Sequence, residues 1–259
     1  MESVGRESVR ARRTRLLRLA RERGRLETSV ASRLMQVSVE TLRRDLRVLE
    51  NAGQIRRSHG VFVPTEIGRH ENPMSVREVN DADQKQRIAQ VAASLIGEAT
   101  TLYLDEGVIP RFMVRHLPVD RVLTVVTASL PTAMALVEAT AHDVVVVGGA
   151  VRRKTLATLG GIGTGPTAGL FVDLAIMGTN GVSVEHGLTT PDPEVARVKE
   201  AAMWASRRRI LICEHLKFGV VSFARFAELA DIGHIVTGAE LPRSMARRFE
   251  AAGPTVLRV

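Results

Sequence analysis

Short apolar runs alternate with helical stretches from residue 81 to the end of the chain, and this alternation limits the possible folds more than any other feature. Runs such as Val144 to Val147 lack the polar alternation of a half-exposed strand, which indicates strands covered on both faces. A helix is expected over about 82–96, and later helices open at Ser129 and Asp192. The pattern predicts an α/β domain with a mostly parallel sheet. Its expected strands are 100–104, 121–127, 143–147, 173–177, 209–213, 234–237 and 255–258.

The first 63 residues follow a different pattern. Apolar residues at helical spacing predict helices over about 8–23, 27–34 and 39–51, and Ser38 is a good N-cap for the third. After Gly53 the pattern changes to that of a small hairpin, or wing. Two short helices joined by a tight turn and followed by a hairpin form a winged helix-turn-helix. The side chains expected to face inward include Val30, Ala31 and Leu34 in the second helix and Val39, Leu42, Leu46 and Leu49 in the third.

Positive charge is concentrated in this N-terminal segment. Residues 1–62 hold fifteen Arg, no Lys and seven acidic residues, whereas residues 63–259 hold 21 basic and 21 acidic residues. Such asymmetry predicts a polyanionic partner for the head, either nucleic acid or an anionic membrane. The uncharged stretches 122–137 and 155–172 contain Pro, Gly and hydroxyl residues, so neither is expected to span a membrane. The first 25 residues lack the apolar run of a signal peptide, and we expect a cytoplasmic, nucleoid-associated protein without a membrane partner.

The sequence offers little for metal or covalent chemistry. Cys213 is the single cysteine, so it provides neither an intrachain disulfide nor a thiolate zinc site. The seven His are scattered without a ligand-like pair at helical spacing. A lone thiol that closes an apolar strand is more often packed in the core than catalytic. We therefore predict no metal, no cofactor and no catalytic residue.

The predicted third helix has the chemistry of a DNA-reading helix. Its apolar stripe leaves Thr41, Arg43, Arg44 and Arg47 on the other side. Such a helix fits the major groove, and an arginine can bond bidentately to guanine. The alternative is a solvated basic helix in a three-helix bundle, but the arginine density of this segment favours DNA.

Residues 37–50, Val-Ser-Val-Glu-Thr-Leu-Arg-Arg-Asp-Leu-Arg-Val-Leu-Glu, resemble the signature of the DeoR family of bacterial transcription regulators, and a basic wing with His59-Gly60 follows them. The resemblance implies that 39–51 is the recognition helix and that Asp45 orients an arginine rather than contacting DNA. This chain differs at Val61, where a second wing glycine is usual. The predicted DNA-binding residues are Ser29, Ser38, Glu40, Thr41, Arg43, Arg44, Arg47, Arg57 and His59.

The resemblance continues through the body, from Lys85 through Gly187-Leu188-Thr189-Thr190 to Lys217-Phe218-Gly219. It implies a DeoR-type sensor domain, similar to sugar-phosphate isomerases, that binds phosphorylated sugars or related metabolites as inducers. The residues alone point to the same edge of the sheet, because ligands bind at the carboxyl ends of parallel strands, where Gly admits an anion and Lys or Arg supplies charge. The candidate effector-binding residues are Asp105, Glu106, Gly107, Ser129, Gly149, Arg152, Gly178, Lys199 and Lys217.

Several departures from the family pattern fall in that region. Glu106, Gly107, Val108 and Ile109 stand where a small residue, Gly and two hydroxyl residues are usual. A Glu106 carboxylate ~4 Å from a phosphate oxygen would repel it by about 4 kcal/mol. Either the inducer differs from the family norm, or the domain serves mainly for oligomerisation and folding. Further departures are Ala128 for Asn, Glu214 for Asp and Leu216 for Ser or Thr.

We therefore predict a winged helix-turn-helix domain over 1–63, a linker over 64–80 and an effector-sensing and oligomerisation domain over 81–259. The expected protein is a sequence-specific repressor of sugar or carbon utilisation genes that binds operator DNA as a dimer or tetramer and responds to a small metabolite. One alternative is a sugar-phosphate isomerase-like enzyme fused to a DNA-binding head. Another is a protein that coats the chromosome without sequence preference.

Overall fold

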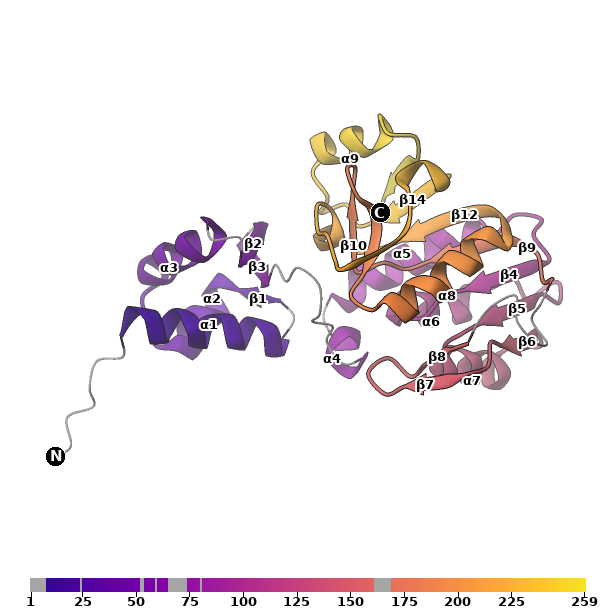
Figure 1. Cartoon of the computed structure of the whole chain (residues 1–259), viewed down its shortest axis with the longest axis horizontal. Helices are drawn as coiled ribbons and strands as arrows, with labels where there is room; N and C mark the ends of the chain where they lie inside the picture. The colour runs from indigo at the N-terminus through magenta and orange to yellow at the C-terminus, as the bar shows by residue number, and fades with distance from the viewer. Residues whose placement is uncertain are drawn as a thin grey trace. The chain divides into compact units, whose positions relative to one another are not determined.

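The computed structural model describes residues 8–23, 25–51, 54–58, 60–64, 74–79, 81–160 and 169–259. The chain divides into two compact units, residues 1–66 and residues 67–259 (Figure 1). Each unit has its own buried core.

The first unit contains helices α1 (Val9–Arg23), α2 (Thr28–Met35) and α3 (Val39–Asn51). A small antiparallel sheet accompanies them, in the order β1 (Leu26–Glu27), β3 (Val61–Pro64) and β2 (Ile55–Ser58). The three predicted helices and the predicted wing are confirmed. Strand β1 was not predicted, because two residues are too few to show a period.

The helix-turn-helix depends on a single left-handed residue. Gln36 ends α2 with φ 54°, and Ser38 then caps α3, its Oγ accepting the Thr41 N–H at 3.1 Å. The prediction that Leu34 and Val39 face inward was wrong, because both side chains are about two-fifths exposed. Helix α2 buries Thr28, Ala31 and Met35, a stripe that leaves Leu34 outside. Val39 is the first residue of α3, one turn ahead of the buried stripe that begins at Leu42.

The second unit is built on a seven-stranded parallel sheet, and all seven predicted strands are confirmed. The chain places later strands on both sides of β4, so the order of strands reverses between β4 and β9. In open α/β sheets such a switch point is where ligands bind. The strand order is β15 (Thr255–Arg258), β14 (His234–Thr237), β12 (Ser206–Ile212), β9 (Val172–Met177), β4 (Thr101–Leu104), β5 (Thr124–Thr127) and β6 (Asp143–Val146).

Helices cover both faces of this sheet (Figure 1). One face packs against α5 (Ala82–Ser94), α6 (Val108–Met113) and α7 (Leu130–Ala139). The other packs against α8 (Pro193–Trp204) and α9 (Arg243–Glu250). This arrangement explains why the strands lack polar alternation.

Some short elements were not predicted. They are α4 (Met74–Val79), the hairpin β7 (Ala150–Arg152) with β8 (Ala157–Leu159), and an antiparallel sheet of β10 (Gly181–Ser183), β11 (Gly187–Thr190) and β13 (Ala224–Ala227). Helix α4 lies within the expected linker, and its Met74 joins the core of the second unit. Helix α4 is too short to show a helical period, and strands such as Gly181–Ser183 and Gly187–Thr190 lack the apolar runs that marked the strands of the parallel sheet.

Candidate functional sites: a basic recognition helix and a pocket at the strand switch

Helix α3 separates its packing side from its cationic side. Leu42, Asp45, Leu46 and Leu49 are buried, whereas Arg43, Arg44 and Arg47 are exposed. Arg44 lies 3.6 Å from the Glu40 carboxylate in a solvent-exposed pair. Within the described residues, Arg43 and Arg47 have no carboxylate in ion-pair range. The exposed side of α3 therefore offers positive charge that the described residues do not neutralise.

The remaining predicted DNA-binding residues are placed as follows. Ser29 and Arg43 line one open groove together with Val61 of the wing. Ser38 and Thr41 lie at the start of α3, with their hydroxyl oxygens 2.9 Å apart. Arg57 belongs to β2, where its backbone pairs with Phe62, but its side chain lies outside the description. His59 lies outside the described residues.

Asp45 fixes α3 to α1. Its carboxylate is almost fully buried and accepts hydrogen bonds from Arg12 Nε at 2.6 Å and Arg13 Nε at 2.8 Å. The prediction that Asp45 orients arginine is confirmed, and the arginines belong to α1. Since two charge-assisted bonds hold this carboxylate, it has little capacity left for other partners.

Thr28 attaches the wing to α2. Its backbone N–H and its hydroxyl both donate to the Gly60 carbonyl, each at 2.8 Å. Gly60 has φ +80°, a conformation that favours glycine in the tight turn between β2 and β3. No pattern in the sequence indicated that Thr28 would reach the wing.

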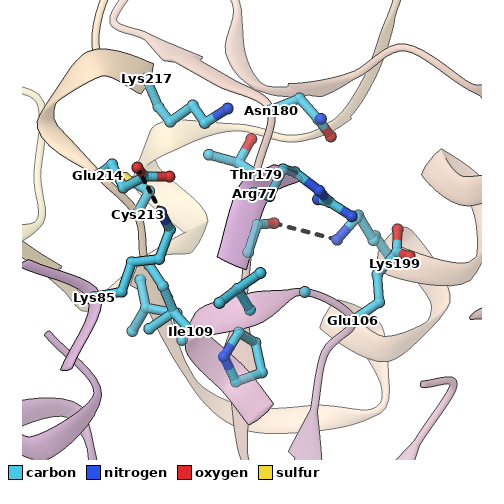
Figure 2. Close-up of a pocket in the computed structure, with 15 residues that line it drawn as sticks. Arg77, Lys85, Glu106, Ile109, Thr179, Asn180, Lys199, Cys213, Glu214 and Lys217 are labelled. Carbon is cyan, nitrogen blue, oxygen red and sulfur yellow. Dashed lines mark hydrogen bonds and ion pairs between the residues drawn. The ribbon is translucent and has the colours of Figure 1, made fainter. Parts of the chain in front are cut away.

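A pocket lies at the carboxyl ends of β4, β9 and β12, beside the strand switch (Figure 2). It contains about 550 Å³ of space, open solvent at its mouth included. Of the predicted effector-binding residues, Glu106, Gly107, Gly178, Lys199 and Lys217 line it. The other lining residues are Arg77, Lys85, Val108, Ile109, Pro110, Thr179, Asn180, Ile212, Cys213 and Glu214.

A buried ion pair lies at one side of the pocket, which its Lys199 lines. Asp105 and Lys199 are both almost fully buried and bonded to each other. Asp105 also accepts the Gly178 N–H at 2.8 Å, and Lys199 donates to the Gly178 carbonyl at 3.3 Å. The pair thereby links β4, the end of β9 and α8 at the strand switch.

A second ion pair lies across the pocket. Lys85 Nζ of α5 is 3.0 Å from Glu214 Oε1, which follows β12 (Figure 2). Lys217, by contrast, has no carboxylate within ion-pair range among the described residues. Cys213 is buried beside Glu214, and burial raises the pKa of its thiol far above the ordinary value. A thiol held in the neutral form is a poor nucleophile.

Four predicted effector residues lie outside the lining of this pocket. Asp105 lies behind it, bonded to Lys199, and local structure uses the other three. Ser129 is buried as the N-cap of α7, where it accepts the Thr132 N–H. Gly149 has φ +118° and lies so close to Gly160 that a Cβ would be 2.5 Å from its nitrogen. Arg152 pairs at 3.0 Å with Asp192, the N-cap of α8.

Sequence reasoning also missed residues that the pocket includes. Arg77 belongs to the expected linker, and nothing in the sequence distinguished it. Thr179 and Asn180 follow β9 directly, so the rule that ligands bind at strand ends could have found them. Within the described part of the chain, no group of His, Cys, Asp or Glu is suited to hold a metal ion. No helix there has the length and apolar character to cross a membrane.

Comparisons with known proteins agree with this two-part organisation. Residues 12–65 match the DeoR-like helix-turn-helix domain, and residues 80–239 match the DeoR C-terminal sensor domain. The HTH-type transcriptional regulator GlpR of Haloferax volcanii is 37% identical over 85% of this chain and 86% of its own length. The glycerol-3-phosphate regulon repressor of Haemophilus influenzae is 29% identical over 88% of each chain.

A solved ribose 5-phosphate isomerase from Methanocaldococcus jannaschii is similar over 54% of this chain and 55% of its own. The TM-score is 0.41 and the identity 13%, so this likeness supports no conclusion about activity. The family models cover nearly the whole chain, and the two relatives named above are transcriptional regulators. The chain belongs to the DeoR family of transcriptional regulators.

Proposed function

We propose that this protein is a sequence-specific repressor of carbon utilisation genes whose operator affinity is adjusted by a small polar metabolite. The observation that carries the proposal is the exposed side of α3, where Arg43 and Arg47 have no acidic partner among the described residues. A helix of this kind suits the major groove of a polyanion.

Each DNA-binding residue has a proposed role. Thr41, Arg43 and Arg44 contact base edges, while Ser38 and Glu40 lie where α3 enters the groove. Arg47 contacts the phosphate backbone. Ser29, Arg57 and His59 contact backbone or an adjacent groove from α2 and the wing. Base contacts give sequence preference, whereas phosphate contacts give affinity and register.

The effector site is the pocket at the strand switch. Its proposed ligand-binding residues are Glu106, Gly107, Gly178 and Lys217, with the Asp105–Lys199 pair behind them. The name of one relative, the glycerol-3-phosphate regulon repressor, favours a metabolite of carbon utilisation as the effector.

Assembly is the other proposed role of the second unit. A single winged helix contacts one half-site, whereas a dimer makes the second contact intramolecular and raises its effective concentration to the mM range. We propose a dimer or tetramer that acts in the cytoplasm on the nucleoid. Sedimentation equilibrium of the full chain tests this, and a monomer at micromolar concentration would contradict it.

Operator binding is tested by fluorescence anisotropy of the full chain with fragments of the promoter of its own gene and with random DNA of equal length. We expect affinity for one fragment to exceed that for random DNA by ~10³ or more. Equal affinity would favour a protein that coats DNA without preference. Turnover of a pentose or hexosamine phosphate by the same preparation would favour the enzyme alternative.

A further inference from the structure

The charges around the pocket are nearly balanced. Four cations, Arg77, Lys85, Lys199 and Lys217, line the pocket together with the carboxylates of Glu106 and Glu214, and the Asp105 carboxylate lies behind the wall. Lys85 is bonded to Glu214 and Lys199 to Asp105, and Arg77 also has an interaction partner. The arrangement leaves one positive charge in excess, on a site with three carboxylates in or directly behind its wall.

Lys217 is the cation best placed to meet a ligand. It is half-buried, and its ammonium group extends into the pocket on the side of Asn180 (Figure 2). Within the described residues, no carboxylate lies within 4 Å of it. A half-buried ammonium gains more from an anionic ligand than an exposed one does, because water screens it less.

This balance suits one negative charge better than two. A phosphate monoester carries about −1.5 to −2 near pH 7 and needs several donors. Glu106 stands at the mouth of the β4 loop, where its carboxylate repels such a group, and its neighbours Val108 and Ile109 supply no hydroxyl donor. A carboxylate carries one charge and is matched by a single ammonium.

The same carboxylates that repel phosphate suit hydroxyl groups. Glu106 and Glu214 are acceptors, and they lie on opposite walls of the pocket (Figure 2). A ligand hydroxyl donates to a carboxylate in a charge-assisted hydrogen bond. Val108, Ile109 and Pro110 form an apolar side on which the C–H face of a short polyol chain packs.

We propose that the pocket binds a polyhydroxylated monocarboxylate, a sugar acid of the aldonate type, with its carboxylate on Lys217 and its hydroxyls on Glu106 and Glu214. This assignment rests on the proposed function, because it identifies the effector that releases the operator. It excludes a phosphorylated sugar as the preferred ligand.

The test is titration calorimetry of the full chain with C4 to C6 aldonates, with the matching aldoses and with the matching aldose phosphates. We expect at least one aldonate to bind with micromolar Kd, at least ~10-fold more tightly than its aldose and its aldose phosphate. Tighter binding of an aldose phosphate, equal binding of the neutral aldose, or no binding by any aldonate would overturn the proposal.

Variants identify the groups responsible. Lys217→Gln should weaken the aldonate at least ~10-fold and leave the aldose unchanged, because only the carboxylate uses the ammonium. Glu106→Gln should weaken the aldonate and strengthen the aldose phosphate. Arg197→Gln on the exposed surface of α8, away from the pocket, is the matched control and should change neither. If Lys217→Gln bound aldonate as tightly as wild type, the proposed orientation of the ligand would be wrong.

Operator binding without any ligand separates the two proposals. If the chain prefers its operator to random DNA, but no aldonate binds the chain or releases it from the operator, only the assignment of the ligand fails. If the chain does not discriminate an operator, the proposed function fails, whatever the calorimetry shows.

Discussion

The cations of the two units differ in how they are partnered. On α3, Arg43 and Arg47 are exposed and have no acidic partner within the described residues. Around the pocket, Lys85 and Lys199 are buried, and each is bonded to a carboxylate. The two units therefore use the same type of charge for different purposes. Unneutralised surface charge attracts a polyanion, whereas a buried pair fixes the geometry of the pocket proposed as the effector site.

Removing one member of the buried Asp105–Lys199 pair should have the largest effect on stability. Lys199→Met leaves the Asp105 carboxylate buried without its cation, which should cost about 3 to 5 kcal/mol in the free energy of unfolding. Urea denaturation followed by the fluorescence of Trp204, the single tryptophan, measures this in the second unit. The double variant Lys199→Met with Asp105→Leu should recover much of the loss, because no charge is then stranded. A loss below 1 kcal/mol in the single variant would contradict this account of the pair.

The buried carboxylate of the first unit provides the matching experiment. Asp45→Ala removes two charge-assisted hydrogen bonds, but the freed Arg12 and Arg13 are partly exposed and can be hydrated. We expect a loss of about 2 to 3 kcal/mol. Far-UV circular dichroism should show the helical transition of the head at lower urea, while the Trp204 transition stays in place. The exposed Glu40→Ala is the control, and an equally large loss there would remove the special role of Asp45.

The fold could be predicted where single stretches of sequence carry a clear pattern. Mainly apolar runs identified all seven strands of the parallel sheet, and the stripe from Leu42 to Leu49 identified α3. The left-handed backbone of Gln36 and the two-residue strand β1 show no recognisable sequence pattern, because each depends on the packing of neighbouring segments. A regular local pattern can be recognised in the sequence, whereas a conformation that depends on contacts with other segments cannot.

The candidate site was predicted only in part, for a related reason. The rule that ligands bind at strand ends gathered Gly178 and Lys217 correctly at one edge of the sheet, but it also selected Ser129 and Arg152. Those two side chains cap or brace helices, and the sequence does not distinguish a brace from a ligand contact. The partner of Asp105 lies 94 residues away in the sequence, so only the fold reveals the pair.

The recognition helix should account for base preference. Arg43→Ala and Arg44→Ala should each cost about 1 to 3 kcal/mol on the cognate operator and relax its sequence preference if that side chain is bidentate to a base. Anisotropy titrations on the operator and on single-base variants measure both effects. Lys217→Gln, which removes a cation from the pocket, should not change the preference. Wild-type binding by both arginine variants would show that the register assigned to α3 is wrong.

Among the described residues, Asp173 is a carboxylate without a cationic partner, and neutral groups donate its hydrogen bonds. Hydrogen bonds from the backbone N–H groups of Thr100 and Thr101, and from their hydroxyls, lower its pKa from 3.8 to about 2. A lowered folded-state pKa adds stability above pH 3.8, and this stability is lost as the pH falls through about 2. Because the group is half-exposed, we expect about 1 kcal/mol. Asp173→Asn should lose that amount at pH 5 and little near pH 2, as measured by urea denaturation. Equal losses at both pH values would show that the charge of this carboxylate contributes nothing.

The smallest expected effect separates the two kinds of cation most directly. Arg47→Ala removes one proposed phosphate contact, so it should weaken binding to every DNA sequence alike and lower the magnitude of the salt slope of log K by about one. Lys217→Gln removes the same charge from the body, but that ammonium lies in a pocket proposed for a small ligand, so the slope should remain that of wild type. Measuring both slopes between 50 and 200 mM salt needs no knowledge of the effector. If the two variants lowered the slope equally, the cations of the pocket would also contact DNA, and the division of charge between the two units would fail.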